Sequence, residues 1–218
     1  VIDSLNINQN TSSVKNLQQR SLSFRIHLDK KDDPLFPKKG YLFDIYFKST
    51  GYFLGGERDY RKLDFSFNTY SSITKKSVIA IRVKLGRLWS WEQSDIDYSY
   101  EKFYLGGSSN MRGWEILKYK TKNGLGDTPV GGIFRFLTNI EFRIQLNESL
   151  GINIFYDGGI LSDNYENFIK SKLGWNTGIG LTFSTPLGPV RLDYAVPFIE
   201  DDINIRNGKI NFGVQYLF

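Results

Sequence analysis

The sequence predicts an antiparallel β-barrel that spans a membrane and has about nine strands. Three observations predict this fold. Apolar and polar residues alternate in nine segments, the segments are about ten residues long, and aromatic residues gather near their ends. Because successive side chains of a β-strand point to opposite faces, each segment has one apolar and one polar face. A strand of about ten residues, tilted by about 45°, crosses the apolar core of a bilayer.

The alternation is clearest in residues 135–146, RFLTNIEFRIQL. Phe136, Ile140, Phe142, Ile144 and Leu146 fall on one face, and Arg135, Asn139, Glu141, Arg143 and Gln145 fall on the other. The same pattern predicts strands in residues 21–29, 40–49, 62–68, 78–86, 151–159, 175–184, 189–196 and 209–218. Few stretches have a helical period, so no helix is predicted.

A soluble β-sandwich is the alternative fold, because a charged face suits its exterior as well as a barrel lumen. The strand length favours the barrel, and so do aromatic residues near the strand ends, which resemble the interfacial girdles of membrane barrels. These aromatic residues are Tyr41, Trp89, Trp175, Tyr194 and Tyr216. The mean hydropathy of −0.33 fits either fold, since barrel strands alternate in polarity.

The composition argues against an enzyme, a cofactor or a metal site. The chain has no cysteine and one histidine, His27, and Ser108 and Ser109 have no histidine near them in sequence. The stretch GLGDT, residues 124–128, lacks the lysine and the spacing of a phosphate-binding loop. Asp32 and Asp33 can be read as Ca²⁺ ligands or, preferably, as caps of a turn. The net charge of +5 is spread along the chain and forms no basic stripe for nucleic acid.

The connections between strands alternate in length. Residues 71–76, 147–149 and 185–189 are short, whereas 51–58, 89–131, 161–173 and 198–207 are longer, and the link 29–40 departs from the alternation. Outer-membrane barrels have short periplasmic turns, long extracellular loops and an even number of strands. Nine strands therefore imply either a tenth within residues 1–16 or the C-terminal part of a larger barrel. Residues 1–16 are mostly polar after Ile7, which favours a preceding loop or partial strand there and a larger barrel.

The last segment, KINFGVQYLF, is predicted to be the closing strand of the barrel, with an ordinary last strand of a sandwich as the alternative. Ile210, Phe212, Val214, Tyr216 and Phe218 lie on one of its faces. Gly213 lies within it, where glycine weakens strand pairing or allows a kink.

The stretch FYLGGSSNMRGWE, in the longest loop, resembles a conserved loop of the BamA/TamA and two-partner-secretion superfamily, also called the bacterial surface antigen family. The matching residues are Phe103, Leu105, Gly106, Gly107, Met111, Arg112, Gly113 and Trp114. Further family landmarks follow in order at Asp29, Asp32, Pro34, Pro37 and Gly40, at Asp157, and at Pro186, Gly188, Pro189, Arg191, Asp193, Ala195 and Pro197. The resemblance covers residues 17–218 and matches the last nine strands of the family's sixteen-stranded barrel. Trp114 replaces the commoner Phe or Tyr, and no periplasmic POTRA repeats are present.

The resemblance implies that the long loop, residues 89–131, folds back into the lumen and that Arg112 meets acidic side chains there. The sequence offers Glu141 and Asp157 on the polar faces of their strands. A guanidinium group pairs well with carboxylates through its planar set of donors. Gly113 would allow a close backbone approach or a positive φ, and Trp114 would add apolar area that seats the loop.

The function implied by the resemblance is insertion of outer-membrane proteins or translocation of polypeptides in the outer membrane of Gram-negative bacteria. Phe212, Gly213, Val214, Tyr216 and Phe218 would form one side of a seam between the first and last strands, where a client strand adds by β-augmentation. The implied partners are the lipid bilayer, nascent outer-membrane or secreted polypeptides, POTRA domains and accessory subunits. A passive, porin-like channel is the alternative function, and a soluble binding module is the third.

Overall fold

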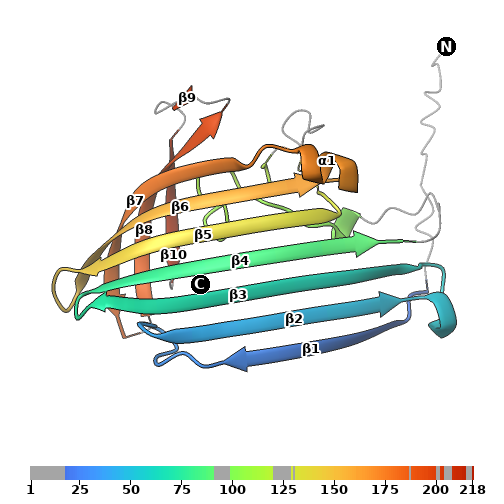
Figure 1. The fold of residues 1–218 in the computed structure, drawn as a ribbon, viewed down its shortest axis with the longest axis horizontal. Helices are drawn as coiled ribbons and strands as arrows, with labels where there is room; N and C mark the ends of the chain where they lie inside the picture. Colours follow the sequence, from blue (N-terminus) through green and yellow to red (C-terminus); the bar gives the residue numbers. More distant parts are fainter. Residues whose placement is uncertain are drawn as a thin grey trace, which may run out of the picture.

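The computed structural model describes residues 18–90, 99–119, 129, 131–186, 188–199, 202–203, 208–214 and 218. These residues form one antiparallel sheet in the order β1 to β8 and then β10, with the two-residue β9 beside β8 (Figure 1). The strands are β1 (Ser21–Asp29), β2 (Gly40–Thr50), β3 (Tyr60–Thr74), β4 (Ser77–Trp89), β5 (Phe134–Gln145), β6 (Leu150–Ser162), β7 (Gly174–Thr185), β8 (Gly188–Ile199), β9 (Asp202–Ile203) and β10 (Lys209–Val214). Two 3-10 helices, Tyr52–Leu54 and Ser99–Glu101, and the α-helix α1 (Tyr165–Lys170) lie between them.

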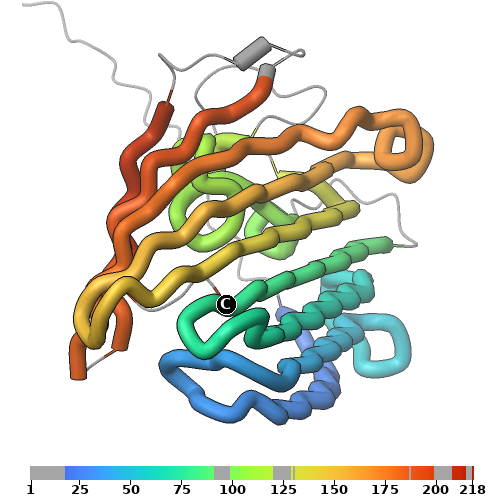
Figure 2. Tube along the Cα trace, turned by 60° about the vertical axis from the view of Figure 1, so that its left-hand side comes forward, coloured from blue at the N-terminus to red at the C-terminus, as the bar shows by residue number. Residues whose placement is uncertain are grey.

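All nine segments predicted from the alternating pattern form strands, and strands that are consecutive among these segments are neighbours in the sheet. The sheet curves into an open shell with β1 and β10 at its two edges (Figure 1). The loop between β4 and β5 lies on the concave side of this shell (Figure 2).

The convex face carries the apolar residues of the strands. The strand register brings these residues into rows across the sheet; one row consists of Ile45, Phe65, Leu85 and Phe136. Many apolar side chains of this face are exposed, among them Phe24, Ile179 and Phe212, each at 60% or more. A soluble protein rarely leaves so wide an apolar surface in water, so this face suits a bilayer.

The concave face has the opposite character, because charged and amide side chains are buried there. Arg82, Asn139, Glu141 and Asp157 are all less than 5% exposed. A soluble sandwich buries its apolar face and exposes its charged one, so this distribution contradicts the sandwich alternative. We call residues 99–119, in the loop between β4 and β5, the inward loop; it covers the polar wall. Loop and strand residues also share a small apolar cluster, which consists of Tyr60, Leu88, Phe103, Leu105, Met111, Tyr119, Leu137 and Leu161.

The structure differs from the sequence expectation in one short helix. α1 was not predicted, since six residues are too few to establish a helical period. The side chain of Asn164 caps this helix by accepting a hydrogen bond from the backbone N–H of Asn167. None of the described helices is long and apolar enough to cross a membrane.

The position of Phe218 also differs from the expectation. The sequence placed it on the outward face of the last strand, but its ring packs inside the shell against Tyr70, Val78 and Ala80. The guanidinium groups of Arg82 and Arg143 lie 4.9 and 5.4 Å from the ring centroid. These cation–π contacts favour an inward ring, and a period-two pattern cannot reveal them. Tyr216 and residues 1–16 lie outside the described part of the chain.

The link between β1 and β2 is a capped turn. Asp32 Oδ1 accepts hydrogen bonds from the backbone N–H groups of Lys38 and Lys39, and Asp33 Oδ1 accepts from those of Leu35 and Phe36. Although slight desolvation opposes the shift, these donors lower the pKa of Asp32. Both aspartates thus have the capping role that the sequence favoured.

Candidate functional site

The inward loop turns sharply at its two central glycines, which gives Arg112 its position. Gly106 and Gly107 have φ values of 112° and 97°, a region that L-residues with a Cβ rarely adopt. Asn110 Oδ1 then accepts hydrogen bonds from the backbone N–H groups of Gly106 and Met111, at 2.6 and 2.7 Å. This side-chain cap fixes the turn that precedes Arg112.

Arg112 is fully buried and meets three carboxylates of the sheet. Its Nε and Nη2 donate to Asp157 Oδ2 and Oδ1 at 2.9 and 2.7 Å. Its Nη1 donates to Glu141 Oε1 at 2.6 Å and, more weakly, to Asp193 Oδ2 at 3.4 Å. We name this set, Arg112 with Glu141, Asp157 and Asp193, the arginine clamp.

The surroundings of Arg112 keep it charged although it is buried. Burial alone would lower the pKa of the guanidinium group, but the carboxylates of Asp157 and Glu141 raise it above its ordinary value. The guanidinium carbon also lies 3.4 Å from the centroid of the Phe155 ring, so one face of the cation is covered by an aromatic face. The backbone N–H of Arg112 donates to Asp157 Oδ2 at 3.2 Å as well.

Further arginines balance the carboxylates of the clamp. Arg143 Nε donates to Glu141 Oε2 at 2.8 Å, and Arg191 Nη1 donates to Asp193 Oδ2 at 3.0 Å. Each of these two carboxylates therefore has a strand arginine beside it in addition to Arg112. A buried ion network of this kind is held by its complete set of partners, and removing one partner leaves an uncompensated charge.

Asn139 joins the clamp to the backbone of the loop. Its Nδ2 donates to Asp157 Oδ1 at 2.7 Å and to the main-chain oxygen of Asn110 at 2.6 Å. Its Oδ1 accepts from Arg82 Nε at 2.9 Å. Because Asn139 is fully buried, these bonds fix the orientation of its amide and orient Asp157 toward Arg112.

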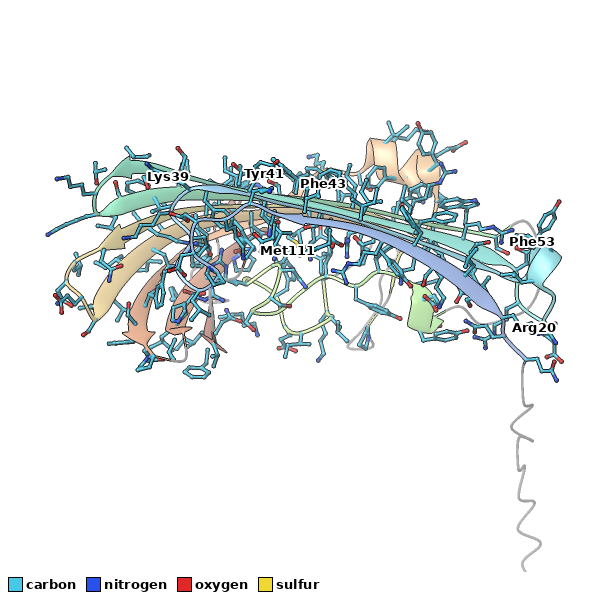
Figure 3. All side chains as sticks on the ribbon, turned by 90° about the horizontal axis from the view of Figure 1, so that it is seen from below. Arg20, Lys39, Tyr41, Phe43, Phe53 and Met111 are labelled. Atoms are coloured by element: carbon cyan, nitrogen blue, oxygen red, sulfur yellow. The ribbon has the colours of Figure 1, made fainter. Side chains whose placement is uncertain are left out.

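Gly113 is needed for a close approach and not for an unusual backbone angle, since it has no positive φ. A Cβ at this position would lie 2.7 Å from Asn176 Cβ and 3.1 Å from Pro197 Cβ. Met111 is fully buried in the apolar cluster. Figure 3 shows it beneath the sheet, on the opposite side from Phe43. Trp114 packs edge-on against the ring of Tyr119, with 5.1 Å between the ring centroids.

A second anchor of opposite polarity holds the start of the loop. Glu101 accepts hydrogen bonds from Lys48 Nζ at 2.7 Å, from the Tyr60 hydroxyl at 2.7 Å and from Lys62 Nζ at 3.3 Å. Desolvation opposes the shift, but these donors lower the pKa of Glu101. We name this set the glutamate anchor. Here the loop supplies the anion and the sheet supplies the cations.

The loop also contacts the last strand. Asn211 Nδ2, on β10, donates to the main-chain oxygen of Arg112 at 2.8 Å, and Lys209 Nζ lies 3.0 Å from Glu115 Oε1. Hydrogen bonds from Lys118 and Lys209 lower the pKa of Glu115 to about 2. The residue that enters the clamp is therefore bonded directly to an edge strand of the sheet.

The structure brings Arg112 together with Glu141 and Asp157, the two partners that the sequence offered. Sequence reasoning missed Asp193, the glutamate anchor and Asn211. Asp193 had a visible signal, because it alternates with Arg191 on the polar face of its strand. Of the predicted seam residues, Phe212 and Val214 lie exposed on β10, and Gly213 lies between them, where an added Cβ would lie 2.9 Å from Arg191 Nη2.

The sequence is similar to those of known outer-membrane assembly factors. The outer membrane protein assembly factor BamA of Nitratidesulfovibrio vulgaris is 25% identical over 198 residues, which cover 89% of this chain and 25% of that protein. The BamA of Neorickettsia risticii is 24% identical, over 83% of this chain and 25% of its own length. A SAM50-like protein of Schizosaccharomyces pombe is 23% identical, over 89% of this chain and 44% of its own length. This chain thus spans less than half of each of these relatives.

The fold matches that of a solved barrel. The crystal structure of BamA from Haemophilus ducreyi lacking POTRA domains 1–3 superposes with a TM-score of 0.73 and 19% identity, covering 90% of this chain and 42% of that chain. The sheet is therefore that of an antiparallel transmembrane β-barrel. The profile of the Omp85 superfamily domain matches residues 3–218. Since this match covers nearly the whole sequence, the chain belongs to the Omp85 superfamily.

Proposed function

We propose that this chain acts in an outer membrane, where it inserts membrane proteins or translocates polypeptides through a seam beside β10. Membership of the Omp85 superfamily supports the proposal, as do the relatives named as outer membrane assembly factors. The lipid bilayer is a partner in this proposal, because its lipids would cover the convex face. The clients are nascent outer-membrane or secreted polypeptides, which reach the barrel through POTRA domains and accessory subunits.

The observation that carries the proposal is the link from the arginine clamp to β10. A client strand can add to a sheet only where an edge offers free backbone groups. β10 is such an edge in the described sheet, and its side chains Ile210, Phe212 and Val214 are more than 60% exposed. The bond from Asn211 to Arg112 ties this edge to a loop that three carboxylates hold, so the clamp sets the position of the edge.

The mechanism needs no catalytic side chain. Backbone hydrogen bonds between the free edge of β10 and the client would replace those to the first strand of the complete barrel, and each released client would restore the original pairing. Gly213, with no side chain to pack, would weaken pairing near the end of β10.

The test uses the full-length protein reconstituted in lipid vesicles. We expect it to accelerate the folding of an unfolded client barrel, and Arg112→Glu to abolish the acceleration. Lys118→Glu is the control, because Lys118 lies in the same loop and its ion pair with Glu115 is exposed at the surface. Ion conductance without any effect on client folding would overturn the proposal and favour the porin-like channel.

A further inference from the structure

Arg87 is a cation that lies among the apolar side chains of the convex face. Arg87 lies on β4 with Leu85 and Trp89, whose side chains face the same way, and it is exposed. The strand register places it in a row with Phe47, Leu63 and Phe134. The next row along the strands, Ile45, Phe65, Leu85 and Phe136, is apolar throughout. Arg87 therefore marks the edge of the apolar band toward the end of the barrel that carries the inward loop.

Arg87 is held between two aromatic rings. Its guanidinium carbon lies 5.3 Å from the centroid of the Trp89 ring and 5.5 Å from that of the Phe134 ring. Both distances lie within the range of cation–π contacts, so the faces of the two rings attract the cation. No carboxylate lies within ion-pair distance of Arg87 in the part of the chain that the structure describes.

The aromatic surface continues on both sides of this cation. The ring of Phe47 lies 6.4 Å from that of Trp89, and the ring of Phe168, on α1, lies 5.6 Å from that of Phe134. Figure 3 shows α1 on the opposite side of the sheet from the inward loop, so this helix lies on the outward face. Tyr165 and Ile169 of α1 are more than 60% exposed. Exposed apolar and aromatic residues beside a cation are typical of the bilayer interface.

We propose that Arg87, Trp89 and Phe134 form a binding site for the phosphate of a lipid headgroup in the leaflet that surrounds this end of the barrel. A guanidinium group offers donors that match two phosphate oxygens. Acyl chains of the same lipid would lie on the apolar row below. The aromatic rings would pack against the glycerol region at the same level. The proposal rests on the outward direction of Arg87 and is independent of any assembly activity.

The test is native mass spectrometry of the full-length protein in detergent with added phosphatidylglycerol. We expect one tightly held lipid, and we expect Arg87→Gln to weaken its binding about tenfold, since a charged hydrogen-bond partner is lost. Arg87→Lys keeps the charge and should retain most of the affinity. Arg25→Gln is the matched control, because Arg25 is an exposed arginine that pairs with Asp44. Its affinity should equal that of the unmodified protein.

Several outcomes would overturn the site. Equal affinity of the Arg87→Gln and unmodified proteins would show that the cation only packs against the rings. Equal retention of phosphatidylglycerol and of diacylglycerol, which has no phosphate, would show that the headgroup phosphate is not recognised. Displacement of the lipid by inorganic phosphate would show that the site takes the free anion. Heat-dependent migration of each variant on gels verifies that its barrel is folded, and failure of client folding has no bearing on lipid retention.

Discussion

Asn211 on the last strand donates a hydrogen bond to the main-chain oxygen of Arg112, 99 residues earlier in the chain, at 2.8 Å. The acceptor is a backbone atom of the residue whose side chain enters three ion pairs. Displacement of the loop would therefore break a contact of β10, and displacement of β10 would disturb the loop. The two elements are coupled through Arg112 and, at the surface, through the ion pair of Glu115 with Lys209.

The first prediction concerns the charge of the clamp. Arg112→Glu should destabilise the seated loop by about 3–5 kcal/mol or more, because it places a fourth carboxylate among three buried ones. Lys118→Glu should cost at most about 1 kcal/mol, since its ion pair is exposed to solvent. Urea unfolding of the full-length protein in micelles measures both. Equal destabilisation by the two changes would remove the special role of Arg112.

The second prediction ranks two carboxylates by the contacts that they make. Asp157 accepts two side-chain bonds below 3.0 Å from Arg112, whereas Asp193 is 3.4 Å from that cation. Asp157→Asn should therefore cost about 3–5 kcal/mol and Asp193→Asn about 1–3 kcal/mol in unfolding free energy. Both changes keep the side-chain shape, so the comparison isolates charge. The reverse order would contradict the geometry of the clamp.

The third prediction concerns the space at Gly113. Gly113→Ala should impair seating of the loop, because the added methyl group would lie 2.7 Å from Asn176 Cβ. Limited proteolysis of residues 99–119 reads out the seating. Asn176→Gly removes the obstructing atom, so the double variant should recover part of the protection. An unprotected loop in both variants would argue that backbone freedom, and not space, is required at this position.

The fourth prediction concerns the glutamate anchor. Glu101→Gln should release the first part of the loop, since two lysines and a tyrosine lose their anionic acceptor. Protease cleavage near residue 101 should increase while the barrel stays folded. Glu115→Gln serves as the control, because Glu115 is exposed and forms only surface ion pairs with Lys118 and Lys209. Cleavage that increases equally in the two variants would argue against an anchoring role.

The fifth prediction follows from Tyr119, whose hydroxyl donates to the main-chain oxygen of Gly159 at 2.8 Å. Burial raises its pKa to about 12, so the folded state favours the neutral phenol. Its contribution to stability is complete below about pH 10, the ordinary pKa of tyrosine, and is lost as the pH rises through 12. Tyr119→Phe should lose the hydrogen bond and flatten the stability profile between pH 10 and 12. Tyr104→Phe, at an exposed hydroxyl, should leave that profile unchanged.

The sequence predicted the nine long strands because the apolar and polar faces alternate over ten or so residues in each. It also predicted the partners Glu141 and Asp157, since both stand on polar strand faces and the family resemblance directed Arg112 toward them. It could not predict Asn211 or Glu101 as contacts of the loop. These contacts depend on how far the loop reaches across the shell, which no local pattern records.

The direction of Phe218 shows the same limit. Its alternation with Phe212 and Val214 predicted an outward ring, but the interior offers Arg82, Arg143 and Tyr70 to that ring. The gain from a guanidinium group beside an aromatic face depends on residues more than 70 positions away in the chain.

The arginine clamp and the glutamate anchor have opposite signs, and this difference fixes the orientation of the loop on the wall. A loop held by two cations, or by two anions, could slide along the wall or enter it reversed and still find partners. Arg112 faces carboxylates and Glu101 faces lysines, so exchanging the two ends of the loop would bring like charges together. The inner wall therefore dictates a single way for this segment to settle.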